Sequence, residues 1–200
     1  MKLPNQPIIT ARCRLRPVQR CDASALMPLY SDVEAMRYWS CPPFTKLTQA
    51  QHLVDRGVSA WQSDDSMMWL IKQGSTGQIV GTLSVFALSA QNRRAEVGYM
   101  LSRSMWGQGL MSEALGAIVH LCFADMGLNR LEADIDPNNG GSARLLQRLG
   151  FQHEGRLRQR WVVDGVKSDS DLYGLLKSDW LATAAAVAMA AKTNKNAPLD

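Results

Sequence analysis

The chain has 200 residues, of which 46% are hydrophobic and 20% charged, and 22 Lys and Arg against 18 Asp and Glu give a formal net charge of +4. This length and apolar content predict one globular domain with a sizeable core and exclude a disordered protein. The longest apolar stretch, residues 184–191, is far shorter than the about 20 residues that a bilayer requires, so we predict no membrane partner. The N-terminal residues lack the apolar segment of a secretory signal, which favours a cytoplasmic location.

The cysteines and the positive charges argue against two kinds of partner. The four cysteines are scattered, without a C-x-x-C pair or neighbouring histidines, so we predict neither a disulfide framework nor a metal site. The basic residues gather in two stretches, residues 2–20 and 144–160, but neither is a contiguous basic run with interleaved aromatic residues. A nucleic-acid partner is therefore not predicted.

Hydrophobic periodicity and turn residues predict strands and helices in the first half of the chain. Asp22 is a candidate N-cap, because an aspartate side chain can accept a hydrogen bond from the first turn of a helix. The predicted elements are a half-buried strand over 12–18, a helix after Asp22, a helix over 48–62, strands over 68–72 and 78–88 that form an antiparallel hairpin, and a strand over 95–101.

The second half of the chain predicts a strand–helix–strand unit. Apolar residues recur every three or four positions over 110–126, which indicates an amphipathic helix ending at Gly127. Alternation over 131–135 predicts the next strand, and a right-handed crossover makes it parallel to the strand at 95–101. The remaining predicted elements are a short helix capped by Ser142 and ended by Gly150, strands near 151–156 and 172–176, and an alanine-rich helix fraying into a tail after residue 180.

The segment 103–114 joins the strand at 95–101 to the long helix and contains two glycines, Gly107 and Gly109. Amides in the first turn of a helix have no partners within it, so a glycine-rich approach to a helix N-terminus can bind a pyrophosphate. The alternative is an ordinary turn that uses glycine for its backbone angles, and spacing alone leaves both interpretations open. A Walker loop is excluded because no Gly-Lys-Ser/Thr follows.

A second pattern contains Asn139, Ser142 and then Leu145-Leu146-Gln147-Arg148-Leu149-Gly150-Phe151. With the strand 95–101 and the loop 106–114, this pattern resembles the GCN5-related N-acetyltransferase (GNAT) superfamily, and within it the RimJ/RimL type, which includes ribosomal-protein N-terminal alanine acetyltransferases. The resemblance implies an α/β fold, with a central mixed, mostly antiparallel sheet flanked by helices and a parallel pair splayed at the acetyl-CoA site.

The resemblance also implies how the chain is divided. The N-acetyltransferase domain would span residues 12–180. An N-terminal arm over residues 1–11 would precede this domain, and an alanine-rich helix with a flexible tail over residues 181–200 would follow it.

The implied reaction is an acetyl-CoA-dependent transfer of an acetyl group to a primary amine. The pyrophosphate would bind loop amides, and the pantetheine arm would run along the strand at 99–101, with an amide near Met100 or Leu101 holding the carbonyl oxygen. Arg144 and Arg148, on one helix face, would meet the phosphates. The implied acetyl-CoA-binding residues are Tyr99, Met100, Leu101, Trp106, Gly107, Gln108, Gly109, Leu110, Met111, Asn139, Ser142, Arg144 and Arg148.

Two residues are implied in catalysis, Ser142 and Glu96. Leu146 stands where many relatives have a tyrosine that protonates the departing thiolate, and Ser142 is the implied replacement, because its hydroxyl can donate a hydrogen bond to a thiolate. The alternative for Ser142 is a plain helix N-cap. Glu96 is the implied general base, since only a neutral amine attacks a thioester, and its alternative is a structural ion pair with Arg93 or Arg94.

The acceptor amine stays open. A protein N-terminal α-amine is the RimJ/RimL-type acceptor, although Trp161 stands near the position where some relatives have a glutamate. Trp39, residues 42–44 and residues 164–165 fall where relatives shape the acceptor cleft. The alternatives are a small-molecule amine acetyltransferase acting on a polyamine, an amino acid or an antibiotic, and a catalytically silent acetyl-CoA-binding module.

A polycationic acceptor would require an acidic cleft. The candidate residues for such a cleft are Asp32, Glu34, Asp64 and Asp65. A homodimer is left open.

Overall fold

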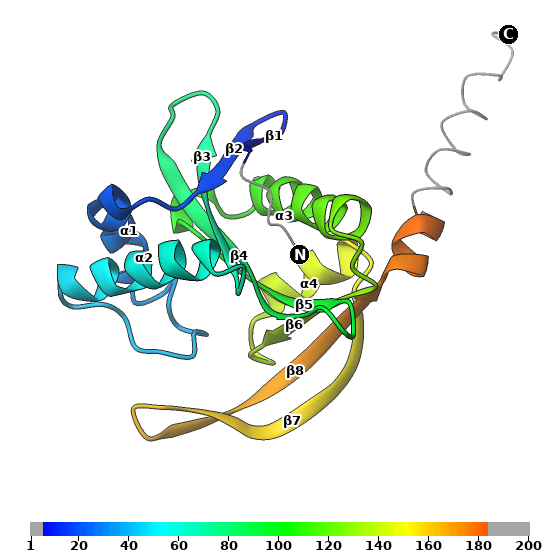
Figure 1. The fold of residues 1–200 in the computed structure, drawn as a ribbon. Helices are drawn as coiled ribbons and strands as arrows, with labels where there is room; N and C mark the ends of the chain where they lie inside the picture. The colour runs from blue at the N-terminus through cyan, green and yellow to red at the C-terminus, as the bar shows by residue number, and fades with distance from the viewer. Residues whose placement is uncertain (1–5, 184–200) are drawn as a thin grey trace, which may run out of the picture.

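The computed structural model describes residues 6–183, and these residues form one eight-stranded mixed sheet in the order β1-β2-β3-β4-β5-β6-β8-β7 (Figure 1). The strands are β1 (Ile8–Ile9), β2 (Cys13–Pro17), β3 (Met67–Gln73), β4 (Ile79–Ser89), β5 (Arg94–Leu101), β6 (Arg130–Ile135), β7 (Gln152–Val163) and β8 (Val166–Leu176). All neighbouring strands pair antiparallel except β5 and β6, which are parallel. The predicted strands, hairpin and parallel pair are thus confirmed.

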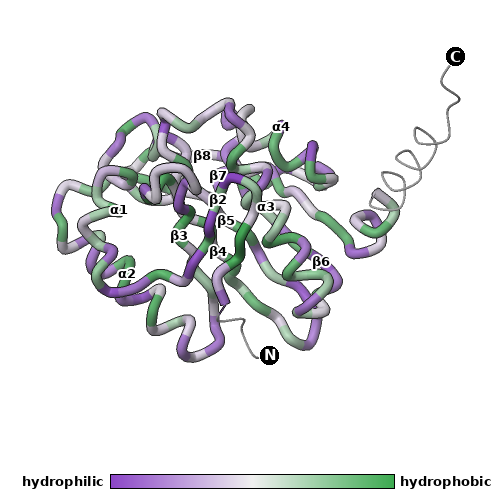
Figure 2. Tube along the Cα trace, turned by 90° about the horizontal axis from the view of Figure 1, so that it is seen from above, coloured by the Kyte–Doolittle hydropathy of each residue, from purple (hydrophilic) through white to green (hydrophobic). Residues whose placement is uncertain are grey.

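Helices cover both faces of the sheet. They are α1 (Ala23–Tyr30), α2 (Leu47–Gln62), α3 (Leu110–His120) and α4 (Gly140–Arg148), with short turns η1 (Arg20–Asp22), η2 (Arg103–Met105) and η3 (Leu121–Asp125). Seen from above, α1 and α2 lie on one side of the central strands and α3 on the other (Figure 2).

Strand β3 shows how the sheet divides the core in two. Met68 and Leu70 pack with the residues of α1 and α2, whereas Trp69 and Ile71 pack with those of α3. All four side chains are buried. A strand that is covered on both faces has no polar face, which explains why this apolar run does not alternate.

The start of α1 differs from the prediction. The Asp22 side chain does not cap the helix. Instead its carboxylate accepts hydrogen bonds from the Gln19 amide at 2.7 Å and from both terminal nitrogens of Arg16 at 2.6 and 2.8 Å. Because Asp22 is only 4% exposed, its charge needs a close cationic partner, and Arg16 supplies it.

The long helix after the glycine loop also differs at its end. Regular α-helix stops at His120, and Leu121–Asp125 forms a π-helical turn. Gly127 follows with a φ of +68°, the left-handed conformation expected of a glycine at a helix end. The apolar stripe continues through the π turn because Leu121, Cys122 and Phe123 remain buried.

The two ends of the described region bear on the predicted arm and tail. Within the predicted arm, Ile8 and Ile9 form β1, which pairs with β2. Residues 177–183 are helical, and the rest of the predicted alanine-rich tail lies outside the described residues. Among residues 6–183, no helix is long and apolar enough to span a membrane, and no group of His, Cys, Asp and Glu side chains is placed to hold a metal ion.

The parallel pair of strands is short. β5 and β6 pair only from Arg94 opposite Arg130 to Glu96 opposite Glu132, although β5 continues to Leu101 and β6 to Ile135. Beyond Glu96 the facing edges of the two strands are not hydrogen-bonded to each other. An unpaired strand edge offers amides and carbonyls to another extended chain, so this gap is a place where a ligand can run along β5.

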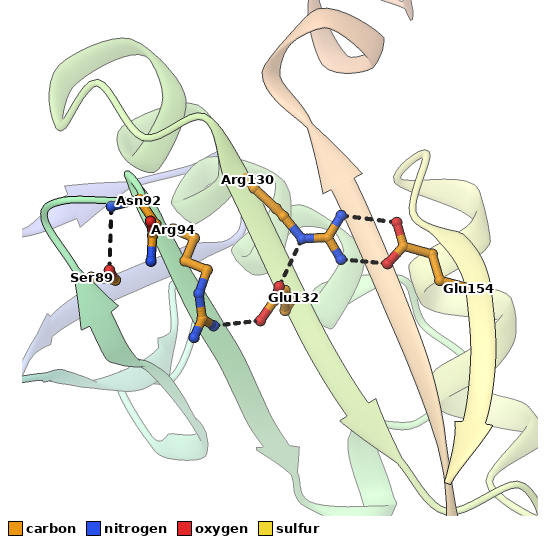
Figure 3. A network of polar contacts seen from close by, with 6 residues as sticks. All are labelled: Ser89, Asn92, Arg94, Arg130, Glu132 and Glu154. Atoms are coloured by element: carbon orange, nitrogen blue, oxygen red, sulfur yellow. Dashed lines mark hydrogen bonds and ion pairs between the residues drawn. The ribbon is translucent and has the colours of Figure 1, made fainter.

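A chain of ion pairs holds the paired end of these strands together (Figure 3). Glu132 accepts from Arg94 Nη1 and from Arg130 Nε, both at 2.7 Å, and Arg130 also pairs with Glu154 on β7. Gly174 lies beneath this chain on β8, where a Cβ would collide with the Glu154 carboxylate and the Arg130 guanidinium. The network therefore ties β5, β6 and β7 together across a glycine on β8.

Candidate active site

The loop before α3 presents unpartnered backbone amides. Gly107 and Gly109 have φ of +74° and +75°, a conformation that favours glycine, and a Cβ at Gly107 would meet nothing within 4 Å. Gly109 is the N-cap residue of the 11-residue α3, and no side chain of residues 6–183 caps the helix there. The first-turn amides and the positive end of the helix dipole are thus free for an anion, as a pyrophosphate requires.

Arg12, just before β2, braces this loop from far away in sequence. Its backbone amide and its Nε donate to the two carboxylate oxygens of Glu113 at 2.6 and 2.7 Å, and its Nη1 donates to the Gln108 carbonyl at 2.9 Å. Arg12 was not among the predicted site residues. Its partners lie 96 and 101 positions away along the chain, so the sequence around residue 12 does not predict these contacts.

Asn139 and Ser142 share the start of α4, and Asn139 rather than Ser142 caps the helix. Asn139 is the N-cap residue, and its Oδ1 accepts a hydrogen bond from the Ser142 amide at 3.0 Å. The prediction that Ser142 caps the helix is therefore wrong. The Ser142 hydroxyl points elsewhere, and its Oγ lies 2.6 Å from the Tyr99 hydroxyl on β5.

The other predicted residues of α4 are placed as follows. Leu146 is fully buried in the core, so it supplies no polar group to the site. Arg148 donates from Nη1 to Ser112 Oγ, in the first turn of α3, at 3.1 Å. Arg144 Nη1 lies over the backbone of Gly140, 3.3 Å from where a Cβ would be. Arg148 therefore carries its charge to the helix end where the loop amides are free, and phosphate contacts by both arginines stay predictions.

A large cavity of about 1160 Å³ occupies the α1 and α2 side of the sheet and reaches the gap between β5 and β6. Glu96, Tyr99, Asn139 and Ser142 all line it, whereas residues 106–111 do not. The loop amides thus lie outside the cavity. A ligand in the gap can be approached by a second molecule from the cavity.

Glu96 is an unpaired carboxylate in the wall of the cavity. It makes no hydrogen bond or ion pair within the part of the chain that the structure describes, because Arg94 is engaged by Glu132. Burial raises the pKa of the Glu96 carboxyl above its usual value, and the neighbouring carboxylates of Glu132 and Asp134 raise it further. The structural ion pair considered as an alternative is therefore not formed, and the role of Glu96 as general base stays a prediction.

Several predicted acceptor residues do line the cavity. Trp39, Pro42, Pro43 and Asp164 are among its walls, whereas Gly165 is not. Trp161 lines the cavity as well, although it was not predicted to shape the acceptor cleft. Phe44 is not among the cavity walls; its ring stacks on that of Tyr30 with 5.1 Å between the centroids.

The predicted acidic cleft is not formed by the four residues proposed for it. Asp32 pairs with Arg103 at 2.7 Å, and Asp64 and Asp65 do not line the cavity. Glu34 does line it but lies 3.4 Å from Arg37.

Asp134 and Arg160 form a part of the cavity that the sequence did not reveal. Arg160 Nε lies 2.6 Å from Asp134 Oδ2, and the Trp161 indole donates to Asp134 Oδ1 at 3.3 Å. The pair joins β6 to β7. The alternation of Arg130, Glu132 and Asp134 indicated that these side chains share a face, but their partners on β7 could not be read from it.

The fold and these features define an acyltransferase with a splayed mixed sheet. The model of the acetyltransferase (GNAT) domain family matches residues 12–152, and the chain belongs to this family. It is 33% identical over 172 residues to the uncharacterized N-acetyltransferase YoaA of Bacillus subtilis, which covers 86% of this chain and 97% of the relative. The predicted family, fold class and enzyme class are confirmed.

Two further matches differ in the acceptor that their names state. The spermidine N(1)-acetyltransferase of Escherichia coli is 25% identical over 152 residues, 76% of this chain and 79% of that protein. A solved structure of the ribosomal alpha-N-protein acetyltransferase RimL, in complex with coenzyme A, matches with a TM-score of 0.78 and 24% identity over 86% of this chain and 98% of that one. This second likeness is one of fold.

Arg12→Ala is expected to raise the KM for acetyl-CoA about 3- to 10-fold with a smaller change in kcat. The ion pair is half-exposed and contributes about 1 kcal/mol or less, and the hydrogen bond to the Gln108 carbonyl contributes a similar amount. Steady-state kinetics would measure the change. Arg14→Ala is the matched control, because Arg14 is an exposed arginine two residues further along, in β2, and equal KM values for the two variants would contradict the role of Arg12.

Proposed function

We propose that this N-acetyltransferase uses acetyl-CoA to acetylate the α-amine of a peptide or protein N-terminus. The observation that carries the proposal is the unpaired carboxylate of Glu96, which faces a large cavity shared with Ser142. A protein α-amine has a pKa of about 7.7–8.0, against about 10.4 for a lysine, so one carboxylate of raised pKa is enough to complete its deprotonation at neutral pH.

The gap between β5 and β6 and the loop before α3 would hold the acyl donor. Residues 107–111 would bind the pyrophosphate through their amides, with Arg144 and Arg148 beside it. The pantetheine arm would run along residues 99–101. Acetyl-CoA supplies a thioester there, whose carbonyl carbon is open to attack from the cavity. A backbone amide near Met100 or Leu101 would hold the carbonyl oxygen as it gains charge, which typically contributes about 3 kcal/mol.

Two side chains would handle the proton and the leaving group. Glu96 would accept the amine proton, directly or through one water. Ser142 would donate a hydrogen bond to the departing thiolate, whose reference pKa of about 8.5 makes full protonation by the enzyme unnecessary. Neither role needs a metal ion.

The cavity is lined by charges of both signs. Two of the carboxylates that line it are matched by arginines, Glu34 by Arg37 and Asp134 by Arg160. Arg56 lines the cavity as well. Asp136 and Asp164 line the cavity too, so its five carboxylates outnumber its three guanidinium groups, and this excess favours a polyamine as the second candidate acceptor.

The test is a CoA-release assay over a panel of acceptors. We expect turnover with peptides that carry a free α-amine and none with the same peptides acetylated at that amine. Spermidine, free amino acids and aminoglycosides should give kcat/KM values at least about 10-fold lower, which corresponds to about 1.4 kcal/mol. A preference for spermidine would assign a small-molecule acceptor instead. No CoA release with any amine, together with intact CoA binding, would indicate a silent binding module.

A further inference from the structure

The Tyr99 and Ser142 hydroxyls form a pair beside the gap between β5 and β6. Their oxygens are 2.6 Å apart, within the range of a strong O–H···O hydrogen bond. Tyr99 lies on β5 beyond Glu96, the last residue of β5 that pairs with β6, and Ser142 lies in the first turn of α4. Both residues line the cavity, and Ser142 is only 8% exposed. The pair therefore joins the strand along which a ligand would run to the helix that faces it.

The direction of this hydrogen bond decides what Ser142 can do. A serine hydroxyl has one proton and two lone pairs. If Ser142 donates to Tyr99, no proton of its hydroxyl is left for a ligand. If Tyr99 donates to Ser142, the serine proton is free to point into the gap.

The surroundings favour Tyr99 as the donor. A phenol is a stronger hydrogen-bond donor than an aliphatic alcohol, so the phenol proton is the one held between the two oxygens. Burial raises the pKa of the Tyr99 hydroxyl well above its usual value, so Tyr99 keeps its proton at every pH at which the protein works. Asn139 fixes the backbone of Ser142 by accepting from its amide, which holds Oγ in place to accept from Tyr99.

We propose that Tyr99 is a positioning residue that donates to Ser142 Oγ and thereby directs the Ser142 proton toward the sulfur of coenzyme A. This inference rests on the acetyl transfer proposed above. As the amine nitrogen bonds to the carbonyl carbon, the C–S bond breaks and its electron pair stays on sulfur. The amine proton leaves through Glu96, the thiolate is stabilised by the Ser142 hydrogen bond, and it takes its proton from solvent. Tyr99 and Ser142 both keep their protons.

The same pairing explains how the site works with a leucine at position 146. The Leu146 side chain is fully buried, and its place in the core cannot be taken by a polar group without a partner. A donor for sulfur has to come from the first turn of α4 instead. Ser142 donates the hydrogen bond there, and Tyr99 on β5 orients the Ser142 hydroxyl toward sulfur.

The test measures the thiol pKa of bound coenzyme A from the ultraviolet absorbance of the thiolate, in a titration that needs no turnover. A hydrogen bond to a thiolate favours the charged form, so the thiol pKa in the wild-type complex should be lower than in the variants. Tyr99→Phe and Ser142→Ala should each raise it by about one pH unit. The double variant should show the same pKa as Ser142→Ala, because Tyr99 acts only through Ser142.

Tyr30→Phe is the matched control for the titration. Tyr30 is another buried tyrosine, and its hydroxyl lies 3.0 Å from that of Thr82. Its loss should leave the thiol pKa of bound coenzyme A unchanged. Equal shifts in Tyr30→Phe and Tyr99→Phe would overturn the proposal, since burial alone would then explain both.

Two other results would also overturn it. Additive shifts in the double variant would mean that Tyr99 acts independently of Ser142, and an unchanged thiol pKa in Ser142→Ala would mean that Ser142 does not reach sulfur. The Ser142→Ala result decides the matter even if Tyr99→Phe proves unstable in thermal melts. A wild-type protein that binds coenzyme A but acetylates no amine would refute the proposed function, while the titration would still report on the hydroxyl pair.

Discussion

Gly109→Glu is expected to weaken coenzyme A binding by at least about 100-fold, or about 2.8 kcal/mol. Gly109 precedes the first turn of α3, where the free amides and the helix dipole favour an anion. A glutamate there would place a carboxylate at the position of the pyrophosphate, and it would also strain a backbone whose φ is +75°. Isothermal titration calorimetry with coenzyme A measures the loss directly.

Gly77→Glu is the matched control for this experiment. Gly77 also has a positive φ, +70°, with nothing within 4 Å of a Cβ, but it lies in the turn between β3 and β4. The two variants carry a similar backbone strain and the same charge, although a Cβ at Gly109 would also lie 3.5 Å from Arg12 Nη2. Equal affinities for the two variants, both folded, would remove the loop before α3 as the pyrophosphate site.

Much of the fold could be predicted because its signals are local. The unit β5–α3–β6 follows from alternation, a helical stripe and a short link, and right-handed crossover then makes the strands parallel. Gly127 and Gly150 end helices with φ of +68° and +92°, as single residues that favour the left-handed conformation. Such patterns need no knowledge of where distant segments lie.

What could not be predicted depends on side chains that meet across the sheet. Arg12 reaches Gln108 and Glu113 only because β2 passes the end of α3. Asp22 resembles an N-cap locally, but the cationic group of Arg16 is a better partner for a buried carboxylate than a helix amide.

The start of α4 also depends on contacts with a distant strand. Asn139 and Ser142 are both good N-cap residues, and the backbone places Asn139 at the N-cap position. Once Asn139 takes the cap, the hydroxyl of Ser142 is left to pair with Tyr99 on β5. The residue types predicted a polar helix start. Which residue caps the helix and which one pairs with Tyr99 depends on the position of α4 beside β5.

Glu96→Gln is expected to lower kcat with an α-amine acceptor about 100- to 1000-fold, since a positioned general base typically contributes 10²–10⁴. Because the pKa of the Glu96 carboxyl is raised, the wild-type profile should fall on the acid side as this group is protonated. In Glu96→Gln that limb should disappear and turnover should follow only the ionisation of the amine. A variant with the wild-type pH profile and rate would exclude Glu96 as the base.

The same substitution should make the protein more stable, which separates a catalytic carboxylate from a structural one. An acid whose pKa is higher in the folded than in the unfolded protein stabilises the fold only below the unfolded value of about 4.3, and this contribution is lost as pH rises through the folded pKa. Glu96→Gln should therefore raise Tm at neutral pH, by about 2 °C at most, and leave it unchanged near pH 4. Asp171→Asn should instead lower Tm at neutral pH, because hydrogen bonds from Arg156 lower the pKa of Asp171 and so stabilise the fold when this carboxyl is ionised. A loss of both stability and turnover in Glu96→Gln would mark Glu96 as structural. A gain of stability with a loss of turnover is expected of a catalytic base that is buried at a cost to stability.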